Sequence, residues 1–395
     1  MEIRSIKYVA TVTGEGITDE WDVYGTDLGI PVYDGTSKRM YFLFGDTEGE
    51  SEIDKTKTRN WRGTVAGYTS TLDFTDGIKW DGFLADENGN ARELVAAHHA
   101  TTPVKENTKI SQGGIEIDGN LYVFYESIRG WGPRASGYWY LNYGGVIKSS
   151  DGGKSFEKLY DLSWIEPTCG AELENAVKVI KEDMALAPLD IDFDVTEHIA
   201  PGFGQMYACD GKDGYIYVFG RHGGRIHGIK VGRVLKESFE SFSEYEYLTG
   251  YTPEGRAIWL RGSAGLNAIA KAPEGAEIIP APTSNMSVQY NEYLKKWMIV
   301  YYYPNKGICF ATAERPYGPY SDITLALPID HPEIVKDIQL GVNGNALYGG
   351  FSHEMLNREN GKIIPLVVSQ WYDRPNTYRF YGSKLFEIEL GLYKR

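Results

Sequence analysis

A strand-and-turn pattern recurs five times along the chain and constrains its fold more than any other feature. In each copy, a turn rich in Gly, Asn, Asp or Lys precedes an apolar strand that ends in a polar or aromatic residue. The copies begin at Asp34, Asp118, Asp213, Asn291 and Asn360. Each follows a short apolar stretch ("LGIPVY", "GGIEI", "QMYAC", "MSVQY" and "SHEML"), and most precede a second pair of strands. The pattern predicts a four-stranded antiparallel unit repeated five times.

The spacing between the copies is irregular, which is too loose for a solenoid but typical of a propeller with loop insertions. We therefore predict an all-β fold, a five-bladed β-propeller that occupies residues 1–395 as a single domain. The first strand, "IKYVATVTG", is expected to complete the last blade beside "GSKLFEIEL". Residues 170–200 depart from the strand pattern and predict an acidic, partly helical insertion. The 46 glycines and 29 tyrosines agree with many strands joined by tight turns.

The charge of the chain limits its partners. The formal net charge is −14 with no basic stripe, which argues against a nucleic-acid partner. An anionic polymer would be repelled, so a neutral polysaccharide or oligosaccharide fits best. No apolar run approaches the roughly 18 to 20 residues of a membrane span. The start, "MEIRSIKYVATVTG", lacks the basic and apolar regions of a signal peptide, so we expect a cytoplasmic or phage-borne protein, or a secreted one whose signal has been removed.

The first predicted blade carries two carboxylates at one end. The innermost hairpin of a blade faces the central channel, so the start of its first strand and the end of its second share one end. These positions hold Asp27, in "YGTDLG", and Asp46, in "YFLFGDTEG". Both lie almost equally far from the predicted turn at Asp34–Lys38, so we expect their Cβ atoms roughly 4.5–5.5 Å apart. Two Asp residues that only cap turns fit the pattern nearly as well.

The same rule predicts further residues at the mouth of the channel, which mix amides, aromatic rings, imidazoles and charges. They are Gln112 and Glu126 in the second blade, Gln205, Arg221 and His222 in the third, Asn285 and Tyr302 in the fourth, and His353, Gln370 and Trp371 in the fifth. This mixture suits a sugar, which presents hydroxyls and apolar C–H faces, although polar residues also line a wet channel that binds nothing. Glu126 fits a further carboxylate near the sugar and a structural hydrogen-bonding role equally well.

The pair of carboxylates has a chemical use. Like-charge repulsion raises the pKa of one of two close carboxyl groups, so one can donate a proton while the other stays an anion. Glycoside hydrolysis needs such a pair, with separations of about 5–5.5 Å for retention and about 6.5–9.5 Å for inversion. Neighbours across a hairpin favour the shorter separation and hence a covalent glycosyl-enzyme.

The segment "GTDLGIPVYDG" followed by "YFLFGDT" resembles the bacterial endo-D-arabinanase family of five-bladed β-propellers (glycoside hydrolase family 183, formerly a domain of unknown function). The resemblance runs over roughly residues 20–392, and its specific part is the "TD" and "FGDT" pair. It implies retaining hydrolysis of α-D-arabinofuranosyl links in mycobacterial arabinogalactan and lipoarabinomannan. The two aspartates of that mechanism match Asp27 and Asp46. We predict Asp27 as the nucleophile and Asp46 as the acid/base, or the two roles exchanged.

Two other functions fit the same residues. One is a non-catalytic glycan- or receptor-binding propeller, as on a phage tail, in which Asp27 and Asp46 only bind hydroxyls. The other is hydrolysis of another furanoside polymer such as L-arabinan. No cofactor and no catalytic metal are expected. "DIDFDVTE" from Asp190 alternates carboxylates like a calcium loop but lacks its central Gly and terminal Glu, so a structural calcium ion is the most that we expect there.

Overall fold

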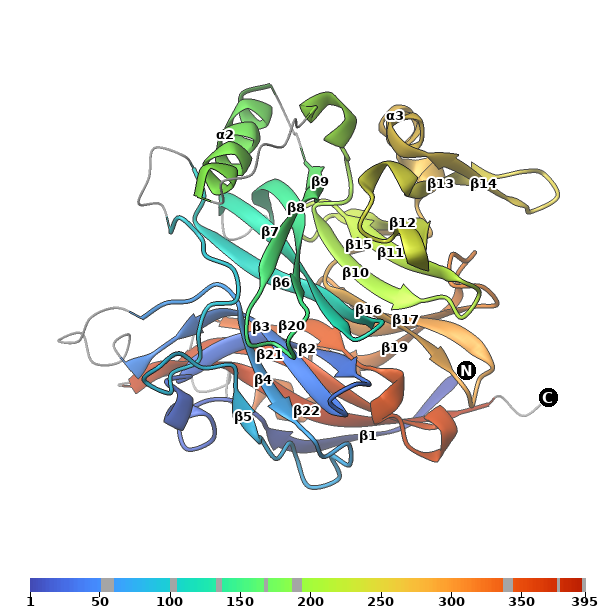
Figure 1. Ribbon diagram of the computed structural model, residues 1–395. Helices are drawn as coiled ribbons and strands as arrows, with labels where there is room; N and C mark the ends of the chain where they lie inside the picture. Colours follow the sequence, from blue (N-terminus) through green and yellow to red (C-terminus); the bar gives the residue numbers. More distant parts are fainter. Residues whose placement is uncertain are drawn as a thin grey trace. The chain divides into compact units, whose positions relative to one another are not determined.

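The computed structural model describes residues 1–50, 60–99, 105–132, 137–166, 170–186, 194–336, 344–374 and 377–392. The fold is all-β, a five-bladed β-propeller of antiparallel blades, which confirms the prediction from the repeat. The strands that form the blades are labelled in Figure 1. The chain divides into two compact units. The first unit comprises residues 1–94 and 284–395 and contains three blades; the second comprises residues 95–283 and contains two.

In the first unit, each blade is a four-stranded sheet. The first contains β2 (Gly25–Asp34), β3 (Arg39–Glu48), β4 (Val65–Thr69) and β5 (Gly82–Phe83). The fourth contains β16 (Met286–Asn291), β17 (Lys296–Tyr303), β18 (Gly307–Ala313) and β19 (Ser321–Pro328). The fifth contains β20 (Gly344–Phe351), β21 (Ile363–Arg374), β22 (Thr377–Gly391) and β1 (Glu2–Thr11). Strand β1 pairs with β22, so the N-terminal strand completes the last blade as predicted.

In the second unit, one sheet has four strands and the other has six. The second blade contains β6 (Thr108–Ile117), β7 (Asn120–Trp131), β8 (Trp139–Ser149) and β9 (Glu157–Ile165). The third contains β10 (Gln205–Asp210), β11 (Tyr215–Arg221), β12 (His227–Leu235), β13 (Glu246–Tyr251) and β14 (Ala257–Arg261), and β15 (Ile279–Thr283) pairs with β12. The last two strands extend this blade beyond the predicted four.

Helices are few in the described residues. The α-helices are α2 (Gly170–Leu186), α3 (Gly262–Lys271) and the short α4 (Pro332–Val335). The 3-10 helices span Asp19–Trp21, Val195–His198, Lys236–Ser238, Phe242–Glu244, Glu274–Ala276, Glu354–Leu356 and Glu359–Gly361. Helix α2 falls within the stretch for which we predict a partly helical insertion. No helix in the described part of the chain is long and apolar enough to span a bilayer.

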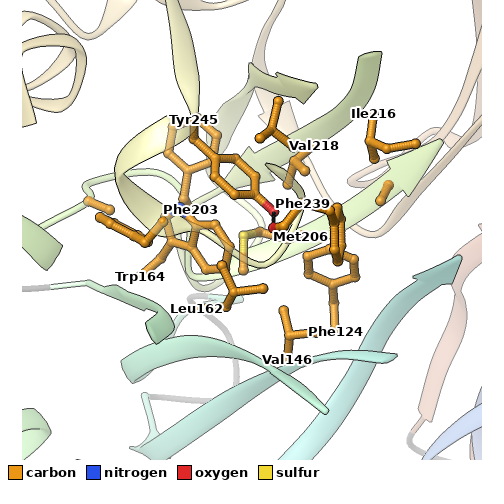
Figure 2. Close-up of a cluster of buried hydrophobic side chains, with 14 of the residues drawn as sticks. Phe124, Val146, Leu162, Trp164, Phe203, Met206, Ile216, Val218, Phe239 and Tyr245 are labelled. Carbon is orange, nitrogen blue, oxygen red and sulfur yellow. Dashed lines mark hydrogen bonds between the residues drawn. The ribbon is translucent and has the colours of Figure 1, made fainter. Parts of the chain in front are cut away.

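The core of each unit lies between its blades, so many strands are buried over most of their length. In the second unit one apolar cluster joins the strands of both blades and includes Trp164, Phe203 and Tyr245 (Figure 2). The indole nitrogen of Trp164 donates a hydrogen bond to the Tyr247 hydroxyl at 2.9 Å, so the polar end of this ring is satisfied inside the cluster. Burial on both faces explains why the strands are nearly continuous apolar runs in the sequence.

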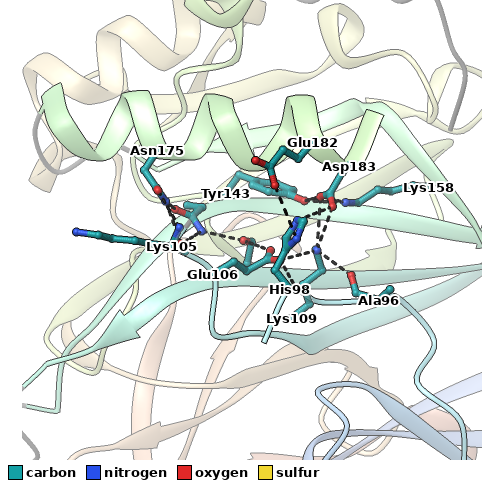
Figure 3. A network of polar contacts seen from close by, with 12 residues as sticks. Ala96, His98, Lys105, Glu106, Lys109, Tyr143, Lys158, Asn175, Glu182 and Asp183 are labelled. Carbon is teal, nitrogen blue, oxygen red and sulfur yellow. Dashed lines mark hydrogen bonds and ion pairs between the residues drawn. The ribbon is translucent and has the colours of Figure 1, made fainter. Parts of the chain in front are cut away.

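Helix α2 is held on the second blade by a buried network of charges (Figure 3). Asp183 of α2 forms ion pairs with Lys158 and with Lys109, the latter at 3.5 Å. The Lys109 ammonium also donates to Glu106 at 2.8 Å, and the Tyr143 hydroxyl donates to Asp183 at 2.9 Å. Burial alone would raise the pKa of Asp183, but the two lysine charges and the hydrogen bonds from Lys158 and Tyr143 outweigh it and lower this pKa.

One predicted strand is wrong. The stretch "SHEML" was expected as the first strand of the fifth blade, but that strand is β20, which ends at Phe351. Residues Glu354–Leu356 instead form a 3-10 helix, and the His353 ring nitrogen Nδ1 accepts a hydrogen bond from the Met355 backbone N–H at 3.1 Å. A side chain that caps a helix competes with strand pairing, and this local preference decides the structure here.

Candidate active site

The hairpin of β2 and β3 places Asp27 and Asp46 at its open end. The turn lies where the sequence predicts it, because Asp34 pairs with Arg39. At the open end of the hairpin Thr26 pairs with Thr47. The next pair toward the turn is Leu28 with Phe44, which leaves Asp27 on β2 and both Gly45 and Asp46 on β3 between the two pairs. Asp27 therefore stands opposite two residues of β3, Gly45 and Asp46, in a β-bulge. Bulges of this kind redirect side chains and are frequent beside active sites.

A second irregularity restores the register at Leu28 and Gly29, both of which have positive φ, at 68° and 87°. A left-handed leucine costs roughly 1–2 kcal/mol. Two serines of the fifth blade hold it: the Leu28 N–H donates to Ser369 Oγ at 2.7 Å, and Ser383 Oγ donates to the Leu28 carbonyl at 3.3 Å. A Cβ atom on Gly29 would lie 2.8 Å from Val367 Cγ1, so this position requires glycine. The backbone beside Asp27 is thus strained and fixed by its surroundings.

The two aspartates are partly exposed in strands that are otherwise mostly buried. Beside them, the hydroxyls of Thr26 and Thr47 are 2.7 Å apart and both residues are fully buried. The strand ends therefore hold two partly exposed aspartates on a rigid base, although Asp27 Oδ1 itself is buried.

Two tyrosines of the fifth blade complete the surroundings of the pair. The Tyr348 hydroxyl donates a hydrogen bond to Asp27 Oδ2 at 3.0 Å. Burial of the Tyr381 phenol raises its pKa well above the ordinary value, and the negative charges of Asp27, Asp46 and Glu48 add to this effect. Tyr381 therefore stays protonated near three carboxylates. A hydrogen bond donated to a carboxylate favours its ionised form, so Tyr348 stabilises the anion of Asp27.

The other predicted residues of the first unit are mostly buried. Asn285 and Tyr302 are neighbours, since the Tyr302 N–H donates to the Asn285 carbonyl at 3.2 Å, but Tyr302 belongs to an apolar cluster. Gln370 is fully buried and donates from Nε2 to the Ile334 carbonyl at 2.6 Å. Trp371 packs against the same apolar cluster and is the register partner of Tyr381.

His353 does not join Gln370 and Trp371, contrary to the prediction. Strand β20 pairs Gly344 with Tyr372 at one end and Phe351 with Val367 at the other. Since His353 follows Phe351, it lies at the turn end of the hairpin, whereas Gln370 and Trp371 lie toward the open end. The error has the same cause as the wrong strand, because the true first strand lies earlier in the chain.

In the second unit, Gln112 and Glu126 are brought together as a buried pair. Gln112 Nε2 donates to Glu126 Oε1 at 2.8 Å, and the Trp139 indole donates to Glu126 Oε2 at 3.1 Å. Glu126 is only 1% exposed. Of the two roles considered for Glu126, these contacts favour the structural one.

Gln205, Arg221 and His222 also lie together. Gln205 and Arg221 are register partners, and the guanidinium of Arg221 donates to Gln205 Oε1 and to the Thr283 carbonyl, the latter at 2.9 Å. Burial lowers the pKa of Arg221 to about 9, although Glu126 opposes this shift. His222 Nδ1 lies 2.5 Å from Glu166 Oε1, in contact with a carboxylate that the sequence analysis did not identify.

No group of three or more His, Cys, Asp or Glu side chains in the described ranges has a geometry that could hold a metal ion. The proposed calcium loop begins at Asp190, and its first four residues lie outside the described residues. Nothing in the structure therefore bears on that ion.

Sequence reasoning missed three residues around the carboxylate pair: Glu48, Tyr348 and Tyr381. Glu48 had a usable signal, because it follows Asp46 by two positions and side chains at i and i+2 of a strand share one face. Tyr348 and Tyr381 had none. Tyr348 is 321 residues from Asp27 in the chain and lies in the strand that was misplaced.

The fold and the hairpin define a class: a five-bladed β-propeller that presents two aspartates at the open end of its first blade. The chain belongs to the family described as "Domain of unknown function (DUF4185)", which matches residues 13–384. No curated protein matches the sequence.

Solved structures are similar to this chain at low sequence identity. A candidate hydrolase from Bacteroides ovatus is 14% identical, with 96% of this chain and 87% of that chain covered at a TM-score of 0.57. The α-L-arabinofuranosidase of Podospora anserina, in complex with cellotriose, is 10% identical over 98% of both chains, with a TM-score of 0.46. The GH43_1 enzyme of Xanthomonas citri, in complex with xylose, is 11% identical over 94% and 89%, with a TM-score of 0.43. The last two superpose too weakly to carry a functional argument.

Proposed function

We propose that this protein is a glycoside hydrolase that cuts D-arabinan internally, at α-D-arabinofuranosyl links, by a retaining mechanism with two carboxylates. The observation that carries the proposal is the β-bulge that sets Asp27 opposite Gly45 and Asp46 at one strand end. The resemblance of the "TD" and "FGDT" segments to endo-D-arabinanases supports the substrate. The fold shared with a candidate hydrolase agrees with hydrolysis.

The contacts of Asp27 support its role as the nucleophile. A nucleophilic carboxylate must be ionised, and the hydrogen bond from Tyr348 favours the ionised form. Asp46 is then the acid/base. This assignment keeps one anion and one proton donor on adjacent strands, as retaining hydrolysis requires.

The reaction has two balanced steps. First, an oxygen of ionised Asp27 attacks the anomeric carbon, the bond to the leaving oxygen breaks, and protonated Asp46 gives its proton to that oxygen. A glycosyl ester on Asp27 results, and Asp46 is left as an anion. Second, Asp46 takes a proton from a water molecule, the oxygen of that water attacks the anomeric carbon, and the ester bond to Asp27 breaks. The sugar leaves with its original configuration, and both carboxyl groups regain their starting states.

The test is incubation of the protein with mycobacterial arabinogalactan and, in parallel, with plant L-arabinan. We expect oligosaccharides from arabinogalactan, with the first-formed reducing ends in the α configuration by NMR. Release of oligosaccharides from plant arabinan alone would show that the substrate is L-arabinan and not D-arabinan. Binding to either glycan, with no oligosaccharides released from either, would favour the non-catalytic glycan-binding protein.

A further inference from the structure

A pocket of about 600 Å³ lies in the second unit, where β11 ends and β12 begins. One wall comes from this connection and from β12, through His222, Ile226, His227 and Lys230. The other comes from the segment after α3, through residues that include Glu277 and Pro280. All of these residues belong to the second unit and to its six-stranded blade.

The ammonium group of Lys230 brings N–H hydrogen-bond donors to the pocket. Its side chain is 1% exposed, and its ammonium is 3.8 Å from Glu277 Oε1, beyond hydrogen-bond distance. Burial lowers the pKa of Lys230, while the charges of Glu277 and Glu166 oppose this shift. Within the described part of the chain, no hydrogen bond satisfies this ammonium. The nitrogen is not among the fully buried polar atoms that lack a hydrogen-bond partner, so it meets the solvent of the pocket, where oxygen atoms of water or of a ligand can accept from it.

Two imidazoles stand next to this amine. The ring centroids of His222 and His227 are 4.4 Å apart, and His222 contacts Glu166. Burial is the main cause that lowers the pKa of His227 to about 4, with smaller contributions in the same direction from His222, Arg221 and Lys230. At neutral pH His227 is therefore uncharged, and its ring offers one hydrogen-bond donor and one acceptor.

The remaining lining decides the chemistry of the ligand. The lining holds one ammonium, Lys230, and two carboxylates, Glu274 and Glu277, so an anionic ligand would meet the carboxylates and a cationic one would meet Lys230. Ile226 is 50% exposed and, with Pro280, offers an apolar surface. We propose that this pocket binds one sugar unit of a neutral glycan, with hydroxyls toward Lys230 and His227 and a C–H face on Ile226. This inference rests on the proposed function for its choice of glycan and assigns no catalytic role to the pocket.

The first test uses hydrogen–deuterium exchange with the Asp46→Asn variant, which prevents turnover. The probe is a hexasaccharide prepared from D-arabinan, with maltohexaose as the control sugar. We expect slower exchange in the peptides of residues 222–230 and 273–281 with the first sugar and no change with the second. This measurement leaves every pocket residue intact, so it does not depend on the folding of a pocket variant.

The second test measures affinity for the same hexasaccharide by calorimetry in the same background. Lys230→Met should weaken binding about 10- to 100-fold, which corresponds to lost hydrogen bonds to a charged donor. Lys236→Met is the matched control, because Lys236 lies in the same unit in an exposed ion pair with Asp118. Ile226→Ala should weaken binding severalfold, whereas Ile258→Ala, at another exposed position of this unit, should not.

The outcomes separate this inference from the proposed function. Binding of the hexasaccharide without protection of the two peptides, or with equal affinity in Lys230→Met and Lys236→Met, would overturn the pocket assignment and leave hydrolysis untouched. No binding at all would also overturn it. Protection that depends on Lys230, in a protein whose wild type releases no sugar from any arabinan, would uphold the pocket and refute the hydrolase.

Discussion

At the scale of single residues, Asp27 and Asp46 interrupt strands whose other side chains are mostly buried. A carboxylate at such a position needs solvent and protein donors, and Tyr348 donates to Asp27 directly. The protonated phenol of Tyr381 lies close enough to the carboxylates of Asp27, Asp46 and Glu48 for their charges to raise its pKa. In the proposed mechanism, the hydrogen bond from Tyr348 distinguishes Asp27 as the nucleophile from Asp46 as the proton donor.

Replacing either aspartate by asparagine should abolish most activity on arabinogalactan. We expect Asp27→Asn to lower kcat by at least 10³-fold, because an amide cannot form the ester, and Asp46→Asn to lower it by about 10²- to 10⁴-fold through loss of general acid–base catalysis. Initial rates of reducing-end release measure both effects. Asp76→Asn, at an exposed position of the same unit, is the control and should keep wild-type activity. Near-normal rates in either site variant would exclude that residue from catalysis.

Removal of the Tyr348 hydroxyl should reveal its effect on Asp27. Tyr348→Phe loses a hydrogen bond to a charged group, worth about 1.5–3 kcal/mol, so kcat/KM should fall roughly 10- to 100-fold. Loss of this donor disfavours the Asp27 anion, so the acidic limb of the pH–rate profile should move to higher pH. Tyr8→Phe, which loses a hydroxyl contact with Thr11 in β1, is the matched control. An unmoved acidic limb would show that Tyr348 does not act on the nucleophile.

At the scale of elements, the β2–β3 hairpin owes its shape to paired irregularities. The first opposes Asp27 to Gly45 and Asp46, and the second, at Leu28 and Gly29, restores the register before the turn. Without this compensation, every later side chain of β3 would face the opposite side of the sheet. Leu28 and Gly29, with their positive φ angles, are therefore the positions at which the hairpin regains its register.

Gly29→Ala tests this interpretation. The added methyl group would meet Val367 Cγ1 at 2.8 Å, and the residue would keep a left-handed φ of 87°. We expect a loss of about 2–4 kcal/mol in unfolding free energy, measured by chemical denaturation, together with reduced activity. Gly16→Ala is the control, because Gly16 has a φ of 78° but nothing within 4 Å of the added Cβ atom. Equal losses of unfolding free energy in both variants would show that the contact with Val367 does not contribute to the effect of Gly29→Ala.

The network beneath α2 is the second element with a measurable contribution. Asp183→Asn leaves the Lys158 and Lys109 ammonium groups short of a buried counter-charge, so unfolding free energy should fall by about 3 kcal/mol at pH 7. Asp151→Asn, in the exposed turn between β8 and β9, should cost much less.

The same variant has a pH signature. The pKa of Asp183 is lowered in the folded protein, so its stabilisation is present above the unfolded value of about 4 and is lost as pH falls through the folded value. The difference between wild type and Asp183→Asn should therefore shrink below about pH 4. A constant difference down to pH 2 would show that the charge of Asp183 is not what holds the helix.

At the scale of the whole molecule, the repeat predicted the fold because each blade carries the same local signals. An apolar run such as that ending at Phe44 follows a turn that begins with Asp-Gly in three copies, Asn-Glu in the fourth and Asn-Gly in the fifth, and these signals are read without tertiary information. The fifth blade shows the limit of that approach, since the glycine-rich β20 lacks an apolar run and the helix cap at His353 resembles a strand start. The added strands β14 and β15 likewise carry no repeat signal.

The candidate site was predictable to the same extent. Asp27 and Asp46 belong to one hairpin, so their proximity follows from a turn and a strand length. Tyr348 and Tyr381 come from the fifth blade, and their approach to Asp27 depends on how β20 and β22 pack against β2. Such contacts between strands far apart in sequence follow from tertiary packing, which residue spacing does not encode.

The central claim is that Asp27 forms a glycosyl ester during hydrolysis and that Asp46 supplies and removes the proton. The most direct measurement is mass spectrometry of Asp46→Asn, quenched in acid during reaction with an aryl α-D-arabinofuranosyl oligosaccharide. The activated leaving group allows the first step without an acid, whereas the second step is slow without a base. We predict an arabinosyl ester on the peptide that contains Asp27. An ester on another residue, or turnover of this substrate at the wild-type rate with no ester, would contradict the account.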